Sequence, residues 1–225
     1  MTSLDNAPQG SVRTPGSPRR LANAAILLAC GWLVLDVVSL TLAFPLAEWY
    51  RTYASMPDVR AAHALLDQPM TAWDNYHWVD PARFILMVAT LVVVSSWIER
   101  SSQVIEPPYV SGLSWAAWVV PIVNFWRPFQ LVRGLFTAST GRRSWILPAW
   151  WTVWIARFLL STHIQIDVDL VYGSAGVERA DRTLIFGHIG LVILTGVGLL
   201  LWIQIIRSIS ATQLPAKADA AADRA

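Results

Sequence analysis

Residues 21–44 read LANAAILLACGWLVLDVVSLTLAF, a run of 24 residues in which Asp36 is the only charged side chain. A helix needs about 20 apolar residues to cross the hydrocarbon core of a bilayer. A cleavable signal peptide has an apolar region of only about 7–15 residues, so we expect a retained membrane helix, although Arg19 and Arg20 precede the run. Pro45 follows the run and predicts the end of this first span.

Three further apolar segments predict crossings, at residues 78–98, 145–161 and 183–207. The predicted fold class is therefore all-α: a polytopic membrane protein with four transmembrane helices in one membrane domain, residues 21–207. Residues 1–20 are rich in Pro, Gly and Ser, and residues 208–225 are Ala-rich and polar. We expect both segments to be disordered cytoplasmic tails.

Two shorter helices are expected outside the spans. Pro57 and Asp58 precede apolar residues at helical spacing, which predicts a short outer-loop helix. Pro128 opens a segment with apolar residues along one side, which predicts an interfacial cytoplasmic helix, although a helix packed on the protein would show the same pattern. Residues 113–123 (LSWAAWVVPIV) are too few to cross, so we expect an interfacial or re-entrant segment there.

Composition agrees with a membrane protein. The chain has 225 residues, 55% of them hydrophobic and 14% charged, against roughly 45–50% and about 25% in soluble proteins. Its net charge of +2 does not indicate nucleic-acid binding, because the basic residues flank apolar segments and form no stripe on a polar domain. The single cysteine, Cys30, lies within the first apolar run and indicates neither a disulfide nor a metal site.

The loop charges predict the orientation. Eleven of the 17 Lys and Arg residues lie before the first span, in residues 99–144 or from residue 207 onward, and five lie in the opposite segments or, as Arg83 does, just inside a span beside them. Because Lys and Arg favour the cytoplasmic side, we expect both termini in the cytoplasm and the protein in the bacterial cytoplasmic (inner) membrane.

We expect four ionisable residues of the predicted spans to form an intramembrane polar cluster. Asp36 lies about 22 Å and Arg157 about 18 Å from the inner boundary, at about 1.5 Å per residue. Asp36 also shares a helix stripe with small residues and Trp32, which favours a place inside the bundle. We therefore predict an Asp36–Arg157 pair, with His188 and Arg83 nearby. Such a cluster suits a proton- or anion-responsive site, or an ion pair that only sets helix register.

A second group of residues combines basic and aromatic side chains on the expected cytoplasmic side, where they could bind anionic lipid headgroups or a membrane partner. Its members are Asn124, Trp126, Arg127, Pro128, Gln130 and Arg133, with Arg142 and Arg143 beyond them. A surface connector carrying ordinary positive charges is the alternative interpretation.

The string PIVNFWRPFQ, residues 121–130, resembles the core motif of the bacterial membrane family called domain of unknown function 4328. Residues 148–154 (PAWWTVW) are similar to the Trp-rich third span of that family. The resemblance implies the four-span layout, and the family has no established activity to transfer.

We find no metal-site, nucleophile-elbow or phosphate-loop motif, and we expect no cofactor, no metal and no catalytic residues. The function predicted first is a non-enzymatic membrane protein of the bacterial envelope that binds membrane lipids or a membrane partner, either another copy of itself or a different membrane protein. A small transporter or channel subunit using the intramembrane cluster is the alternative, and an intramembrane enzyme is the least favoured.

Overall fold

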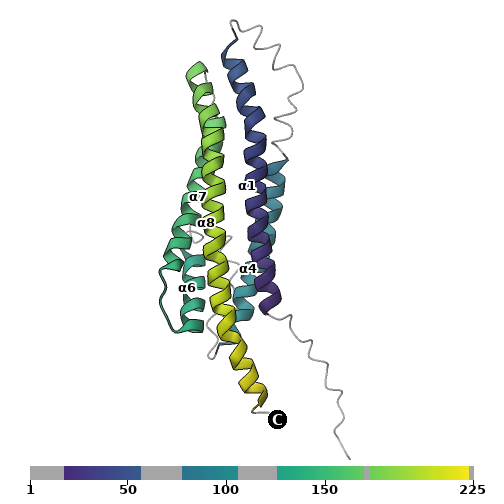
Figure 1. Ribbon diagram of the computed structural model, residues 1–225, viewed down its shortest axis with the longest axis vertical. Coiled ribbons are helices and arrows are strands. Elements are labelled where there is room, and N and C mark those ends of the chain that lie inside the picture. The colour runs from purple at the N-terminus through teal and green to yellow at the C-terminus, as the bar shows by residue number, and fades with distance from the viewer. Residues whose placement is uncertain (1–17, 57–77, 106–125, 170–172, 223–225) are drawn as a thin grey trace, which may run out of the picture.

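The computed structural model describes residues 18–56, 78–105, 126–169 and 173–222. These residues form five helices: α1 (Pro18–Ala54), α4 (Val79–Ser102), α6 (Arg127–Thr140), α7 (Ile146–Asp169) and α8 (Gly173–Ala222). Figure 1 shows that the helices run along one long axis, with the start of α1 and the end of α8 at the same end of the molecule. We call this the lower end. The outer-loop helix expected after Pro57, the segment 113–123 and residues 1–17 lie outside the described residues.

Helix α1 does not stop at Pro45, as the sequence predicted, but continues to Ala54. Proline removes one backbone hydrogen bond from a helix, and packing of the following turns offsets that loss. Ala43, Leu46 and Ala47 are fully buried beyond or beside the proline. Arg51 extends the attachment, because its Nε donates to both carboxylate oxygens of Asp181 in α8 at 3.1 Å. Tertiary contacts therefore override the local helix-breaking signal.

Other helix ends also differ from the predicted ones. Helix α1 begins at Pro18, within the predicted tail, and α7 continues from the predicted end at residue 161 to Asp169. Helix α8 begins ten residues before the predicted residue 183 and passes Arg207, so residues 208–222 are helical. The disordered tail that we predicted there is wrong for those residues. Helix α4 is close to its predicted bounds.

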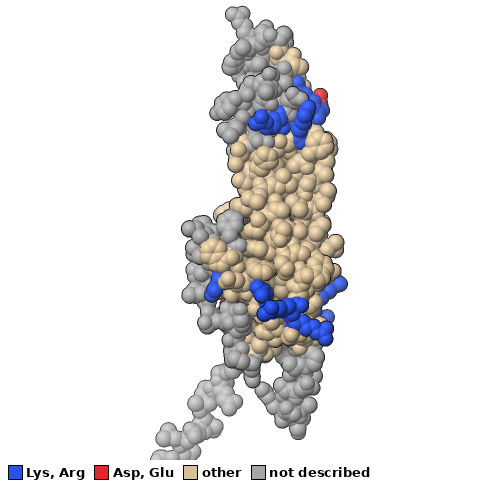
Figure 2. Space-filling view, turned by 90° about the vertical axis from the view of Figure 1, so that its left-hand side faces the viewer, with Lys and Arg blue, Asp and Glu red and all other residues tan. Residues whose placement is uncertain are grey.

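Three helices are long and apolar enough to cross a membrane: α1, α4 and α8. Figure 2 shows Lys and Arg side chains in two bands near the two ends of the molecule, with an uncharged surface between them. Large apolar side chains are exposed over that zone, including Leu27, Phe84 and Ile193, each at 60% or more. A soluble protein rarely exposes so continuous an apolar surface, so these features mark a membrane protein. Four crossings, as predicted, are not established by length and composition, because α7 is not among the three helices.

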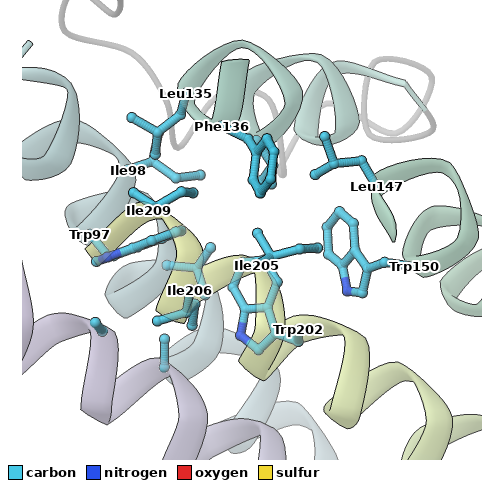
Figure 3. Close-up of a cluster of buried hydrophobic side chains, with 14 residues drawn as sticks. Trp97, Ile98, Leu135, Phe136, Leu147, Trp150, Trp202, Ile205, Ile206 and Ile209 are labelled. Atoms are coloured by element: carbon cyan, nitrogen blue, oxygen red, sulfur yellow. The ribbon is translucent and has the colours of Figure 1, made fainter. Parts of the chain in front are cut away.

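The buried residues form two hydrophobic clusters at different heights. The lower cluster joins all five helices, and Figure 3 shows its core of Trp, Ile, Leu and Phe side chains, among them Trp97, Trp150, Trp202 and Leu135. The upper cluster joins α1, α7 and α8 through residues such as Leu46, Ile164 and Leu184. Between the two clusters along α1, α7 and α8 lie buried polar side chains.

Helix α6 is a packed helix. Pro128 occupies its first turn, and Gly141, with a φ of 67°, ends it in the left-handed conformation that glycine adopts readily. Leu131, Val132, Leu135 and Phe136 are buried, and α6 contacts α4, α7 and α8 beside the lower part of the bundle (Figure 1). Its apolar side therefore faces protein. The sequence had left two alternatives open, a helix facing lipid and a helix packed on the protein, and the structure has the second.

Candidate functional site

A polar cluster lies inside the bundle, and Asp36 of α1 is at its centre. The stripe of small residues on α1 turns Asp36 inward: Ala22, Ala25 and Ser39 are buried with it, and Asp36 itself has no exposed surface. Arg157 of α7 reaches it, with one terminal guanidinium nitrogen 3.0 Å from each carboxylate oxygen. The structure thus brings together the two residues that the sequence paired by depth.

Thr195 of α8 completes this pair. Its hydroxyl donates to Oδ2 of Asp36 at 2.6 Å and accepts from Nε of Arg157 at 2.7 Å. One side chain therefore bonds both charges, and three helices meet at one point. Sequence reasoning missed Thr195. A signal was present, because Thr195 lies seven residues after His188, on the same face of α8.

Arg83 of α4 adds a second positive charge. Its terminal nitrogens lie 3.7 Å from Oδ1 of Asp36 and 3.6 Å from Oδ1 of Asp80, which is half-exposed near the upper end of α4. It also donates a hydrogen bond to Oγ of Ser39 at 2.9 Å. The charges alternate in sign along the series Asp80–Arg83–Asp36–Arg157, so each inner charge has an opposite neighbour, as buried membrane charges generally require.

An aromatic ring covers the Arg157 guanidinium. The Cζ atom of Arg157 lies 4.8 Å from the ring centre of Trp32 of α1, within the range of a cation–π contact. Trp150 and Trp154 share a face of α7 with Arg157 at helical spacing, but they stack on other rings: Trp150 on Trp202 and Trp154 on Trp151. The Trp32 ring is held in place by its own N–H, which donates to Thr90 of α4 at 3.2 Å.

His188 is buried on the same face of α8 as Thr195. Its Nδ1 lies 2.6 Å from the carbonyl oxygen of Leu184, to which it donates in the corresponding tautomer. Within the described residues no group of three or more His, Cys, Asp and Glu side chains could hold a metal ion. The cluster thus joins α1, α4, α7 and α8, and both carboxylate oxygens of Asp36 accept hydrogen bonds within it.

The second predicted group is divided by the structure. Arg133 of α6 and Arg143, in the link before α7, line a groove of about 390 Å³, together with Phe129, Thr137, Ser144, Trp145, Leu147 and Pro148. Of the other predicted residues, Pro128 is buried, Trp126, Arg127 and Gln130 are exposed, and Asn124 lies outside the described residues. Arg127 donates to Gln130 at 3.4 Å along α6. Among the described members of the predicted group, Arg133 is thus the one that lines the groove, and Arg143, predicted beyond the group, lines it as well.

The groove suits a small anion-bearing group. Its volume is within the roughly 300–1,000 Å³ typical of ligand pockets. Guanidinium groups bind phosphate and carboxylate through paired hydrogen bonds, and hydroxyls of Thr137 and Ser144 lie in the same lining. Trp145 is 73% exposed at the mouth, a position that indole rings favour at a membrane surface.

Comparison with protein families gives a match over residues 76–211, more than half of the chain, to the family described as domain of unknown function (DUF4328). The chain belongs to this family. Comparison with curated proteins and with solved structures gives no match. The matched region contains α4, α6, α7 and α8 as far as residue 211, and therefore the groove and the parts of α4, α7 and α8 that surround Asp36.

Proposed function

We propose that this family member crosses the bacterial cytoplasmic membrane four times, through α1, α4, α7 and α8, with both ends of the described chain in the cytoplasm. The course of the chain supports α7 as the additional crossing. Helix α1 begins and α8 ends at the lower end (Figure 1), which requires an even number of crossings. Between α4 and α8, α7 has 24 residues and spans about 36 Å, enough for a core about 30 Å thick.

The distribution of arginine supports the orientation. The described residues of the lower end carry Arg19, Arg20, Arg100, Arg127, Arg133, Arg142, Arg143 and Arg207. Those of the upper end, apart from buried Arg83, carry Arg51, Arg179 and Arg182 together with Glu48, Asp80 and Asp181. Because Lys and Arg favour the cytoplasmic side, the lower end is assigned to the cytoplasm.

Cysteine labelling tests this topology. In a Cys30→Ser background, single cysteines replace Ser55, Gln103, Ser144 or Arg179, and intact cells are treated with a membrane-impermeant maleimide. We expect labelling of the variants at positions 55 and 179 and protection of those at 103 and 144. Labelling of both the Ser144→Cys and the Arg179→Cys variants from outside would show that α7 does not cross, because these positions flank α7.

The groove between α6 and α7 is proposed to bind the phosphate-bearing headgroup of an anionic phospholipid. The observation that carries this proposal is the convergence of Arg133 and Arg143, from two different elements, on one groove at the cytoplasmic end. Each arginine near an anionic membrane surface contributes about 1 kcal/mol to binding. The exposed side chain of Trp145 in the lining supports a location at headgroup level, because indole rings favour that zone of the membrane.

Native mass spectrometry of the protein released from nanodiscs tests headgroup binding. The double variant Arg133→Gln/Arg143→Gln should lose its preference for phosphatidylglycerol over phosphatidylcholine by roughly 30-fold, from about 1 kcal/mol per arginine. The matched control, Arg127→Gln/Arg207→Gln, removes the same charge outside the groove and should keep most of the preference. Equal losses in the two variants would mean that the end of the molecule attracts anionic lipid only through its total charge, and the groove would have no specific part.

In this proposal the cluster around Asp36 has a structural part. Its charges neutralise one another, and both carboxylate oxygens are occupied by Arg157 and Thr195. When the register of α1 against α7 and α8 is fixed, the position of the first turn of α7 within the bundle is fixed as well. The groove lies beside that first turn. Transport through the cluster, the alternative expected from the sequence, stays a prediction that the Asp36 variants discussed below address.

A further inference from the structure

An aromatic ladder rises along the surface of α7 from the α6–α7 groove. The ring centres of Phe129 and Trp151 are 5.9 Å apart. Those of Trp151 and Trp154 are 4.8 Å apart, with their planes within 10°. Phe158 follows at 6.2 Å and 9°. Phe129 lines the groove, so the groove and the ladder share a residue and form one continuous surface.

The ladder is partly uncovered within the protein. Phe158 is 43% exposed, its neighbour Leu159 is 59% exposed, and Trp151 and Trp154 are half-buried. In the membrane zone between the two charged bands, an uncovered ring contacts lipid. Stacked rings spaced three and four residues apart form a flat apolar strip along the helix. Aromatic rings keep this strip flat because they are rigid, whereas side chains with several rotatable bonds would not.

The dimensions fit one lipid tail. From Trp145 at the groove mouth to Phe158 the helix advances 13 residues, or about 20 Å. One leaflet of the hydrocarbon core is about 15 Å deep, half of the core thickness of about 30 Å. The strip therefore begins at headgroup level and ends near the middle of the bilayer, as the tail of one phospholipid does.

We infer that the groove and the ladder together hold a single anionic phospholipid, with its phosphate between Arg133 and Arg143 and one acyl chain lying along Phe129, Trp151, Trp154 and Phe158. This inference rests on the headgroup binding proposed above and adds that the ligand is a tailed lipid in a defined orientation. Charge complementarity selects the headgroup, and continuity with the ladder determines the direction of the tail. Because surrounding lipid is as apolar as the ladder, the tail contact gains from packing rather than from the hydrophobic effect.

Quenching by brominated acyl chains tests the path of the tail, because bromine quenches an indole only in close contact. Phosphatidylglycerol with brominated tails is added at low fraction to unbrominated phosphatidylcholine nanodiscs, and brominated phosphatidylcholine at the same fraction is the reference. We expect stronger tryptophan quenching by the phosphatidylglycerol. The variant Trp154→Phe should remove most of this excess, since it keeps an aromatic ring and deletes the reporter. The matched control Trp78→Phe removes a lipid-exposed indole at the upper end, 75% exposed, and should leave the excess unchanged.

The outcomes separate the two proposals. If the excess requires Arg133 and Arg143 but survives both Trp154→Phe and Trp151→Phe, the headgroup site stands and the tail inference is overturned. If Arg133→Gln/Arg143→Gln keeps the whole excess, the headgroup proposal fails and the ladder inference fails with it. Glycerol phosphate in the buffer supplies a third arm. If it displaces brominated phosphatidylglycerol at concentrations near those of the lipid, the tail adds nothing to binding, and a headgroup site alone remains.

Discussion

Replacing Asp36 by asparagine tests whether the buried charges stabilise the bundle. The substitution keeps the shape of the side chain and removes its charge. Arg157 then loses a carboxylate whose two oxygens both lie at 3.0 Å, and Thr195 loses the charged acceptor at 2.6 Å. Arg83 keeps its hydrogen bond to Ser39 at 2.9 Å, and its remaining described ion-pair partner is Asp80, at 3.6 Å. Two guanidinium groups that are 15% and 20% exposed remain with less negative charge to balance them.

Two measured scales give different magnitudes for this loss. Contacts between polar groups of membrane helices average about 0.6 kcal/mol, so three contacts sum to about 1.8 kcal/mol. Removing one partner of a buried ion pair costs about 3–5 kcal/mol, because the other charge stays behind uncompensated. Asparagine still offers a hydrogen-bond acceptor to Arg157, which places the expected loss in free energy of unfolding between these values, at about 3 kcal/mol.

Unfolding of the purified protein by SDS in mixed micelles, followed by tryptophan fluorescence, measures this loss. Trp32 lies against Arg157 and reports on the site directly. Asp80→Asn is the matched control, because the Asp80 side chain is 52% exposed and its pair with Arg83 should contribute less than about 1 kcal/mol. The double variant Asp36→Asn/Arg157→Gln should be less destabilised than the sum of the single variants, by about 0.5–3 kcal/mol.

The reasoning is refuted if Asp36→Asn costs no more than about 0.6 kcal/mol, the average for one polar contact, or no more than Asp80→Asn. A variant that keeps its stability while an assigned activity disappears would favour the transport alternative, since a register pair cannot be lost without cost.

Four further substitutions test other positions by the same unfolding measurement. Thr195→Val deletes two hydrogen bonds to charged groups without changing shape and should cost about 1.5–3 kcal/mol; no loss would mean that Thr195 is replaceable in the cluster. Gly187→Ala places a Cβ 2.7 Å from Ile164 of α7 and should cost about 1–3 kcal/mol, whereas Gly196→Ala meets nothing within 4 Å and should be neutral or stabilise by up to about 1 kcal/mol. Leu135→Ala, in a fully buried position of α6, should cost about 2–5 kcal/mol, and a cost near zero would show that α6 does not pack on the bundle.

Depth arithmetic could identify the Asp36–Arg157 pair because the rise of a helix is constant. Two opposite charges on helices that run in the same direction meet when their distances from the boundary agree. Thr195 carries no charge and lies among Gly, Val and Leu, so only its seven-residue spacing from His188 set it apart from a hydroxyl bonded to its own helix. Spacing could not identify the partner ring of Arg157, because it shows only which residues of one helix share a face, and Trp32 comes from a neighbouring helix.

Local rules also failed at Pro45, since they say nothing about the buried turns that follow it. For α6, the apolar pattern predicted the helix and its buried side but not what covers that side. Lipid and protein interiors are both apolar, so the same residues suit either. The groove between α6 and α7 depends on how two elements meet. Of the residues predicted for that end and described by the structure, Arg133 and Arg143 line it, whereas Trp126, Arg127, Pro128, Gln130 and Arg142 are not in its lining.

The distance along the chain between Asp36 and Arg157 has a consequence for biogenesis. The two residues are 121 positions apart, so at roughly 5–20 residues per second a ribosome needs about 6–24 s to reach the second after the first. During that interval the nascent α1 carries a carboxylate without its principal partner, at a cost of about 2.5–3.5 kcal/mol for a charge at the centre of an inserted helix. The helices translated last, α7 and α8, therefore supply the partners of Asp36 in the helix translated first. The polar cluster can form in full only when translation has passed Thr195.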